Sequence, residues 1–213
     1  MRIVAISDTH AQFDQVVNDL PDGDVLLHAG DITNVGEIKD LWNFAKQIRD
    51  IKSKYKDIIV IGGNHDFCLG NAQRLLSEKI LFDVGVKYLH DSGIESCNLN
   101  FWGSPYQPEF CDWQFNLPRG NALAAKWKLI PENTNVLITH SPPYNILDAV
   151  HHQNVGCCDL AMRVKQLKEL KLHVFGHIHP EYGQLIDGNT TFVNASLVNN
   201  WNQIVNSPIV LDL

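Results

Sequence analysis

The sequence predicts an α/β fold in which two sheets pack face to face and helices cover both outer surfaces. Short β-branched runs alternate with amphipathic stretches through the first two-thirds of the chain, which is typical of βα units and a largely parallel sheet. From about residue 84 the apolar segments become shorter, and the C-terminal part has the same pattern of short segments. A second sheet would explain these short segments. No linker, low-complexity segment or internal repeat interrupts the chain, so we expect a single domain over residues 1–213.

The expected elements of the N-terminal half follow directly from its apolar spacing. Buried strands are predicted at residues 3–6, 25–29 and 58–61, because each run is apolar and mostly β-branched. A helix is predicted from residue 35 to about 53, and another at residues 71–79. The apolar face of the first helix consists of Ile38, Leu41, Trp42, Ala45 and Ile48.

Shorter strands are expected in the rest of the chain, with helices at residues 121–129 and 159–170 between them. Pro118-Arg119-Gly120 precedes the first of these helices, and Pro131 follows it. The tripeptide Asp187-Gly188-Asn189 separates two alternating runs, which predicts a β-hairpin. The strands are expected at residues 86–89, 94–96, 99–103, 136–139, 173–175, 182–186, 190–194 and 209–212.

The composition argues against a nucleic-acid or membrane partner. Lys and Arg total 17 against 24 Asp and Glu, so the formal charge is −7 and no positive field steers nucleic acid. The basic cluster Lys52, Lys54 and Lys56 is interpreted as a solvated face, because a groove that follows phosphates needs many more cations. The start resembles no signal peptide, and no apolar run reaches the roughly 20 residues that span a bilayer. We therefore expect a soluble, cytoplasmic protein.

The five cysteines indicate thiols rather than a disulfide framework. Their spacing is irregular, and the adjacent pair Cys157-Cys158 is poorly placed for a relaxed disulfide. Neither Cys-x-x-Cys nor a zinc-finger spacing occurs. A metal bound by this chain would therefore use oxygen and nitrogen ligands.

Five fragments place a metal-type ligand directly after a predicted strand. Because the carboxyl ends of parallel strands meet at one rim of a sheet, folding would gather these groups where α/β enzymes have their chemistry. The fragments are Asp8-Thr9-His10, Gly30-Asp31, Gly63-Asn64-His65-Asp66, His140 and Gly176-His177-Ile178-His179.

Each fragment alone has an ordinary structural explanation. Asp8-Thr9-His10 would cap a following helix, Gly30-Asp31 and Gly63-Asn64 are common turns, and His140 would be a core histidine. Their joint occurrence at strand ends, together with a His-x-His pair, favours a metal site instead.

The ligand types predict two metal ions rather than one. Seven groups with one bridging carboxylate supply four protein contacts to each ion and leave positions for water and substrate. Two ions at roughly 3.5–4 Å lower the pKa of a shared water towards about 7 and hold the attacking and leaving oxygens of a phosphoryl transfer. His65 is the spare imidazole and can protonate the leaving alkoxide, with Asp66 orienting it or raising its pKa. The seven groups are Asp8, His10, Asp31, Asn64, His140, His177 and His179.

In order, the fragments give the pattern D-x-H, G-D, G-N-H-D/E, H and G-H-x-H, which resembles the calcineurin-like metallophosphoesterase superfamily. The match is complete and spans residues 8 to 179. The resemblance implies the metallophosphoesterase fold, a four-layer αββα sandwich of two mixed sheets flanked by helices. It implies that His65 lies near the leaving oxygen. It also implies one metal held by Asp8, His10, Asp31 and His179, and a second held by Asp31, Asn64, His140 and His177.

Further segments resemble the small metallophosphoesterase-domain-containing (MPPED-type) subfamily, which is associated with phosphodiesterase activity on cyclic nucleotides and related compounds. Some animal members lack the first His of G-H-x-H and are weak enzymes. His177 is present here, so both metal sites are expected to be competent. The segments are residues 30–34, 103–105, 115–120, 126–127, 139–143, 156–157, 173–179 and 194–196.

The chain departs from the Ser/Thr protein-phosphatase branch after its second motif. Gly30-Asp31 continues as Ile32-Thr33-Asn34, where that branch has an Asp-Arg-Gly whose arginine grips the phosphate. Asp66 also follows Gly-Asn-His where that branch has Glu. Without the arginine, a phosphate dianion on a protein surface is a less natural substrate than a diester.

Three residues, Asn34, Asn116 and Arg119, are predicted to contact substrate. Arg119 lies in a loop near a helix start and would either touch the substrate phosphate or form a surface salt bridge. His28 and His173 belong to apolar runs and are interpreted as core residues or supports of the metal ligands. Four aromatic residues either pack the smaller sheet or stack a nucleobase: Trp102, Tyr106, Phe110 and Trp113.

We therefore expect a binuclear metal-dependent phosphoesterase that hydrolyses phosphodiesters such as cyclic nucleotides by attack of a metal-bridging hydroxide. The alternatives are phosphomonoesterase, nucleotidase or nuclease action at the same metals, and a non-catalytic metal-bound scaffold. Mn²⁺, Fe²⁺/³⁺, Zn²⁺ and Ni²⁺ all suit this ligand mix. The expected partner is a small-molecule phosphoester such as a nucleotide, and the sequence carries no sign of the oligomeric state.

Overall fold

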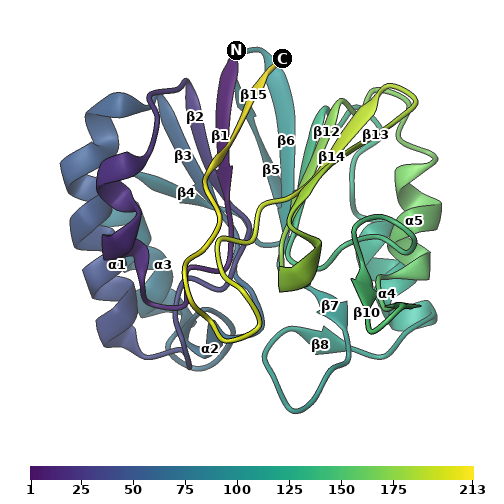
Figure 1. The fold of residues 1–213 in the computed structure, drawn as a ribbon, viewed down its shortest axis with the longest axis horizontal. Helices are drawn as coiled ribbons and strands as arrows, with labels where there is room; N and C mark the ends of the chain where they lie inside the picture. Colours follow the sequence, from purple (N-terminus) through teal and green to yellow (C-terminus); the bar gives the residue numbers. More distant parts are fainter.

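The β-branched runs of the N-terminal half form one sheet of order β15-β1-β2-β3-β4, which the C-terminal strand β15 joins at one edge and the short strand β4 at the other (Figure 1). The computed structural model describes all 213 residues of the chain. Strands β1 to β4 run parallel, as predicted, and β15 pairs antiparallel with β1. The strands are β1 (Arg2–Ile6), β2 (Val25–His28), β3 (Asp57–Val60), β4 (Val86–Tyr88) and β15 (Ile209–Asp212).

The shorter segments form a second sheet of order β13-β14-β12-β9-β6-β5. Its inner strands are parallel, while the edge strands β5 and β13 are antiparallel to their neighbours. The predicted hairpin is confirmed, because Asp187 pairs with Thr190 and leaves Gly188, with a φ of 59°, and Asn189 as the loop. The strands are β5 (Ser92–Ser96), β6 (Leu99–Ser104), β9 (Val136–Thr139), β12 (Leu172–Phe175), β13 (Gly183–Asp187) and β14 (Thr190–Asn194).

Helices cover the outer face of each sheet, so the predicted order of helix, sheet, sheet and helix is confirmed (Figure 1). Helices α1 (Ile38–Ile51) and α3 (Arg74–Asp83) pack on the first sheet, and α4 (Asn121–Trp127) and α5 (Cys158–Val164) pack on the second. The smaller elements are α2 (Phe67–Gly70), the 3₁₀ helices η1 (Phe13–Gln15), η2 (Val17–Asp19), η3 (Lys52–Lys54) and η4 (His179–Glu181), and the strand pairs β7 (Gln107–Pro108) with β8 (Asn116–Leu117) and β10 (Ala149–Val150) with β11 (Gln153–Asn154).

Two helices on the first sheet start later than predicted. The helix expected from residue 35 starts at Ile38, because Gly36 turns the chain with a φ of 76°. The helix expected at residues 71–79 is α3, which is shifted towards the C-terminus. Its shift follows from a local turn, in which the Asn71 side chain accepts a hydrogen bond from the backbone two residues later.

The two helices on the second sheet are shorter than predicted. Helix α5 ends at Val164, although the apolar spacing suggested a helix to residue 170. Leu167 and Leu170 are buried as expected, but they reach the core from hydrogen-bonded turns. Helix α4 ends at Trp127, two residues before its predicted end at 129.

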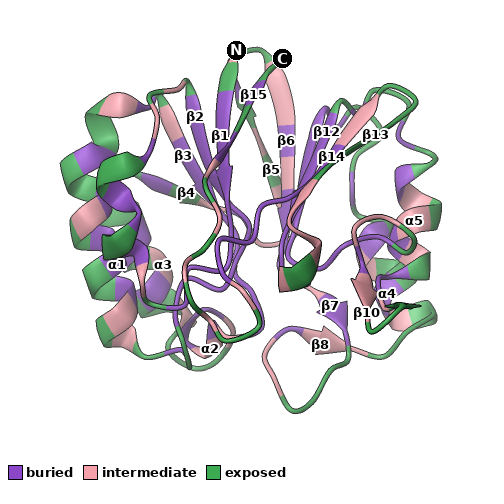
Figure 2. Ribbon diagram, in the orientation of Figure 1, coloured by how far each residue is buried: buried purple, intermediate pink, exposed green.

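The alternation of side chains along the strands produces three apolar layers. In β1, Ile3 and Ala5 face the second sheet, whereas Val4 and Ile6 face the helices. In β9, Leu137 faces α4 and α5 while its neighbours face the first sheet. Strands buried on both faces therefore have continuous apolar sequences. Figure 2 shows the buried strands between helices that are exposed on one side only.

The parallel strands of both sheets end at the same edge of the sandwich, which is the lower edge in Figure 1. Strands β1, β2 and β3 lead to the loops that carry Asp8, Asp31 and Asn64, and β9 and β12 lead to His140 and His177. The two termini lie together at the opposite edge. None of the helices combines the length and the apolar character that crossing a bilayer requires.

Candidate metal centre

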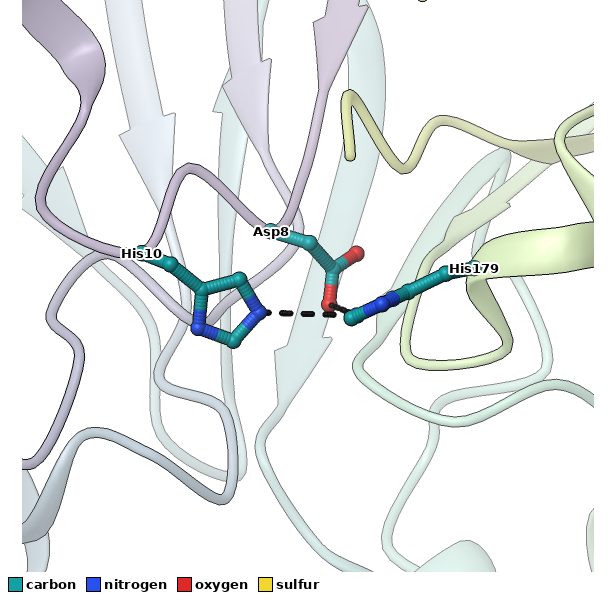
Figure 3. A group of neighbouring side chains, drawn as sticks. All are labelled: Asp8, His10 and His179. Carbon is teal, nitrogen blue, oxygen red and sulfur yellow. Dashed lines mark hydrogen bonds and ion pairs between the residues drawn. The ribbon is translucent and has the colours of Figure 1, made fainter. Parts of the chain in front are cut away.

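Asp8, His10 and His179 form a first group of potential metal ligands (Figure 3). Asp8 and His10 follow β1, and His179 begins η4 after β12. One ligand atom of each residue lies within 4.8 Å of those of the other two. His179 Nε2 is 3.4 Å from Asp8 Oδ1 and 3.4 Å from His10 Nε2. The two imidazoles and the carboxylate therefore point at one another.

Asp31, His140 and His177 form a second group, in which the ligand atoms again lie within 4.8 Å of one another. Asn64 belongs to this group, because its Oδ1 is 2.9 Å from His140 Nε2. The His140 ring is also close to the carboxylate, with Nε2 at 3.3 Å from Asp31 Oδ2.

Asp31 lies between the two groups. Its Oδ2 is 3.8 Å from His10 Nε2 and 3.3 Å from His140 Nε2. The structure thus brings together all seven residues predicted as ligands, in the two sets that the sequence suggested. Their binding of metal stays a prediction, but Asp31 is placed to contact an ion in either set.

Four of these residues have a left-handed backbone conformation, with φ of 54° at Asp8, 42° at His10, 56° at Asp31 and 66° at His177. Residues other than glycine rarely adopt it, although Asp and His are among those that do so most often. At a strand exit the positive φ turns the chain sharply and directs the side chain across the rim. Backbone strain of this kind is concentrated at functional sites.

Backbone carbonyls fix the orientation of two imidazoles. His140 Nδ1 is 2.9 Å from Ala29 O, and His179 Nδ1 is 3.2 Å from Asn199 O. Because a carbonyl oxygen can only accept a hydrogen bond, each Nδ1 carries the proton. The Nε2 lone pairs then face the centre, which is the arrangement found in metal-ligating histidines.

The donor set fits divalent cations, because the lone pairs of imidazole nitrogens face the lone pairs of carboxylate and amide oxygens. In these tautomers His140 Nε2 points at the oxygens of Asp31 and Asn64 with no hydrogen between them, and His179 Nε2 points at Asp8. A positive charge, on a metal ion or a proton, removes this repulsion for all of these oxygens together. The metal-free protein also favours a positive charge at this place. Burial lowers the pKa of His140, but the charge and hydrogen bond of Asp31 raise it to about 9.

His65 lies beside the first group, with its ring centroid 4.6 Å from that of His10. Its backbone N–H donates to Asp31 Oδ1 at 2.8 Å, and its Nδ1 lies 2.5 Å from Asn34 O. One of its ring nitrogens is within 4.8 Å of ligand atoms of His10 and Asp31. The predicted proton donor is therefore adjacent to the cluster, and its catalytic role stays a prediction.

Asp66 does not orient His65, contrary to the expectation from the sequence. Its carboxylate is fully buried and accepts hydrogen bonds from Gly63 N at 2.9 Å, Thr33 N at 2.8 Å and the Thr33 hydroxyl at 2.8 Å. Burial and the nearby charge of Asp31 raise the pKa of Asp66 to about 6. The side chain points away from His65 and ties the loop after β2 to the loop after β3.

The comparison with known families agrees with this geometry. Residues 1–181 match the model of the calcineurin-like phosphoesterases, and the match includes all seven potential ligands. The chain belongs to the calcineurin-like phosphoesterase family. As a member of this family with clustered groups of potential metal ligands, it is a metal-dependent phosphoesterase.

Relatives in this phosphoesterase family extend over the whole chain. The human and mouse proteins named metallophosphoesterase domain-containing protein 1 are each 41% identical over 241 aligned residues, covering 100% of this chain and 71% of their own length. A UPF0046 protein of Caenorhabditis elegans is 39% identical over 221 residues, covering 99% of this chain and 74% of its own length. The solved structure of TT1561 of Thermus thermophilus has a similar fold, with a TM-score of 0.65 at 15% identity over 91% of this chain and 88% of that one. The predicted fold is confirmed.

A cavity of about 490 Å³ opens beside the metal ligands of this phosphoesterase. His177 and His179 form part of its lining. Its apolar walls include Phe110, Val150 and Val155, and its polar walls include Glu109 and His151. A substrate bound in this cavity would lie against the open side of the ligand cluster.

Of the three residues predicted to contact substrate, only Arg119 lines this cavity. Its guanidinium forms no salt bridge but donates to Gly156 O at 2.7 Å and to Val155 O at 2.5 Å. These carbonyls hold the charged group at the cavity wall. Contact between Arg119 and substrate stays a prediction.

The two asparagines do not line this cavity. The Asn116 amide donates to Phe110 O at 3.0 Å and to Cys111 O at 2.8 Å and so closes its own loop, and contact between Asn116 and substrate stays a prediction. The Asn34 side chain is exposed, and the backbone carbonyl of Asn34 accepts the hydrogen bond from His65. Contact between the Asn34 side chain and substrate stays a prediction.

His28 and His173 are buried behind the ligands, as expected. His28 Nε2 is 3.0 Å from the hydroxyl of Thr9, and His173 Nε2 is 2.8 Å from the hydroxyl of Thr139. Burial lowers the pKa of each imidazole to about 3, so both are neutral at physiological pH. Each supports a threonine next to a ligand residue, Thr9 between Asp8 and His10, and Thr139 before His140.

Sequence reasoning missed the residues that hold the ligands and His65 in place. The carbonyls of Ala29 and Asn199 have no side-chain signal. Trp113, expected to pack the smaller sheet or to stack a nucleobase, stacks on His65 with ring centroids 4.0 Å apart. Phe110 has its ring centroid 6.1 Å from that of His177 and is 57% exposed at the cavity.

Proposed function

We propose that this phosphoesterase hydrolyses small phosphodiesters, with cyclic nucleotides as the first candidates. The observation that carries the proposal is the cavity beside the ligands, whose mixed apolar and polar lining holds a single Lys or Arg side chain, Arg119, and also the carboxylate of Glu109. A diester carries one negative charge and an organic group on each side, which such walls can accommodate. A monoester dianion favours additional cations. The volume of about 490 Å³ lies in the range of small-molecule sites.

The residues of the chain have distinct roles in this reaction. Two bound divalent ions would supply Lewis-acid activation of water and neutralise charge on the phosphoryl oxygens. Asp31 holds the two ligand sets at a fixed distance, and His65 is placed to give a proton to the leaving oxygen. Phe110 offers an exposed ring at the cavity on which a planar group such as a nucleobase could stack.

The cofactors and the setting are proposed on the same basis. Imidazole, carboxylate and amide ligands support two divalent ions chosen from Mn²⁺, Fe²⁺/³⁺, Zn²⁺ and Ni²⁺. All five cysteines are free thiols, which supports a reducing compartment such as the cytoplasm. A small phosphoester, rather than nucleic acid, is the proposed partner, because the net charge of −7 would repel a polyanion.

The test is a hydrolysis panel with the metal-free protein reloaded separately with each metal. The panel contains 2′,3′- and 3′,5′-cyclic nucleotides, mononucleotides, bis-p-nitrophenyl phosphate and p-nitrophenyl phosphate. We expect kcat/KM for the diesters to exceed that for the monoesters. The reverse order would replace the proposal by a phosphomonoesterase or nucleotidase function at the same centre.

Two variants serve as controls for the panel. His65→Ala should lower turnover while metal content stays at the wild-type level, because each of the two proposed ligand sets keeps its four ligands without His65. His177→Ala should lower both metal content and turnover. Absence of hydrolysis of bis-p-nitrophenyl phosphate by the wild-type protein at saturating Mn²⁺ would favour the non-catalytic scaffold.

A further inference from the structure

We infer that Trp113, together with the carbonyl of Asn34, positions the His65 ring so that it delivers a proton only from Nε2. The inference rests on the proposed phosphodiesterase function and adds to it a positioning residue from outside the ligand motifs. Trp113 is not among the seven predicted ligands, and it acts through His65, on which it stacks.

The His65 ring is constrained both at its edge and on its face. At the edge, Nδ1 lies 2.5 Å from Asn34 O. On the face, the Trp113 indole is stacked with a centroid distance of 4.0 Å and an interplanar angle of 30°. A hydrogen bond at one edge fixes the direction of the ring, and a stacked neighbour resists rotation out of that plane. Backbone bonds to Asp31 Oδ1 and the Thr33 hydroxyl hold the peptide itself.

Trp113 is held independently of His65. The next residue, Gln114, donates its backbone N–H to Asn64 O at 3.1 Å, which ties this loop to the residue before His65. The ring centroid of Phe67 lies 5.7 Å from that of Trp113, so the indole is next to the rings of both His65 and Phe67. The loop itself is closed by the Asn116 amide. The loop that carries the indole is therefore tied to the segment around His65 by backbone and aromatic contacts.

The tautomer follows from the acceptor. Asn34 O has no hydrogen to give, so Nδ1 keeps its proton whether His65 is cationic or neutral. When the P–O bond breaks, its electron pair goes to the leaving oxygen, and the Nε2 proton of the cationic ring moves to that oxygen. The ring is left neutral with its Nδ1–H still bonded to Asn34 O. Phosphorus forms its new bond to the oxygen of a hydroxide derived from water, the co-substrate of the hydrolysis, and no proton beyond that of Nε2 is needed for the leaving oxygen.

The test uses two substrates that differ in their need for a proton. Bis-p-nitrophenyl phosphate releases a phenolate that is stable as an anion, whereas a cyclic nucleotide releases an alkoxide. We expect Trp113→Ala to lower kcat for the cyclic nucleotide that the wild type turns over fastest by about 10-fold or more, within the range that general acid catalysis contributes. We expect kcat for the p-nitrophenyl diester to fall much less, and metal content to stay unchanged.

A double-mutant cycle separates positioning from a general structural effect. In the His65→Ala background, Trp113→Ala should cause no further loss with the cyclic nucleotide, because the group on which the indole acts is absent. Trp113→Phe should recover most of the activity, since it keeps an aromatic face. Trp42→Ala on α1, where the indole is 48% exposed, is the matched tryptophan control and should behave as wild type.

Spectra of the metal-free protein give a readout that does not depend on activity. In ¹H–¹⁵N correlations, His65 should show the Nδ1–H form with nuclear Overhauser contacts to the Trp113 indole, and Trp113→Ala should broaden or mix the two tautomers. Equal losses with both substrates, or additive losses in the cycle, would overturn the inference while the proposed function stands. Absence of diester hydrolysis by the wild type would instead overturn the proposed function.

Discussion

At the residue scale, Asp31 is the carboxylate that lies between the two groups of potential metal ligands. Its Oδ2 faces His10 and His140, and its Oδ1 accepts the backbone N–H of His65. Burial alone would raise the pKa of Asp31, but the charge and hydrogen bond of His140 hold it well below its ordinary value. The carboxylate is thus a buried anion whose charge both ligand sets share.

Asp31→Asn should therefore derange both metal sites. The amide keeps the shape and one carbonyl oxygen but removes the negative charge that the two sets share. We expect metal content below the wild-type stoichiometry and a fall in kcat/KM of about 100-fold or more, comparable with the loss of an important transition-state interaction. Metal analysis by mass spectrometry after dialysis measures the first, and diester hydrolysis the second. Wild-type stoichiometry in this variant would refute the bridging role.

At the element scale, the exit of β12 approaches the exit of β1 so closely that only glycine fits between them. A Cβ on Gly176 would overlap the carboxylate of Asp8 and the side chain of Ser7. His177 N, the next backbone donor, lies 3.1 Å from both oxygens of Asp8. The glycine of the G-H-x-H motif thus sets how near the two strands bring their ligands.

Gly176→Ala should displace Asp8 and weaken metal binding in the set with His10 and His179. Titration calorimetry with Mn²⁺ would measure the loss, for which we expect at least about 10-fold in affinity, as for other changes that misplace ligands. Gly120→Ala is the matched control, because its Cβ would meet nothing within 4 Å although φ is 85°. Equal metal affinities for the two variants would contradict the close-approach argument.

The sequence could predict the strand exits but not how the loops connect to one another. Each ligand follows a continuous apolar run, so the parallel topology alone brings them to one rim. Asp66 shows the limit, because its place next to His65 in the sequence suggested a catalytic contact. At a turn, neighbouring side chains diverge, and its carboxylate instead binds Gly63 and Thr33. Trp113 is distant from His65 in the sequence, and no pattern in the sequence predicts the contact between the two rings.

Asp66→Asn tests this structural role. One carboxylate oxygen becomes an NH₂ group that cannot accept the hydrogen bonds from the loop, so buried donors lose their partner. We expect the free energy of unfolding to fall by about 2–3 kcal/mol and metal affinity to weaken with it. Urea unfolding of the metal-free protein measures the first effect. Unchanged stability together with reduced turnover would restore the original catalytic prediction for Asp66.

At the scale of the whole molecule, the metal centre joins the two sheets. Loops after strands of the first sheet supply Asp8, His10, Asp31 and Asn64, whereas loops after strands of the second supply His140, His177 and His179. The sheets otherwise meet through their shared apolar layer. A bound ion in either set therefore holds together groups that unfolding separates.

Metal removal should lower the melting temperature for this reason. A ligand that binds only the folded state stabilises it by about 2.7 kcal/mol at a concentration 100 times its Kd. Differential scanning calorimetry with Mn²⁺ and with chelator should show a higher Tm with metal, rising with metal concentration. His177→Ala should reduce this difference. An identical Tm under both conditions would show that the ligands do not hold metal at these concentrations.

The neutral core histidines make stability depend on pH. Burial lowers the pKa of His173 from the ordinary 6.5 to about 3, so between these values the unfolded chain binds a proton that the folded one does not. The free energy of unfolding should therefore fall by about 1.4 kcal/mol for each unit of decrease in pH below the ordinary pKa. His173→Phe, which leaves an apolar ring beside Phe175 and Phe192, removes this term and should give a flatter pH profile. Urea unfolding in chelator at several pH values measures both slopes. Parallel profiles for wild type and variant would mean that the folded protein already binds a proton at His173.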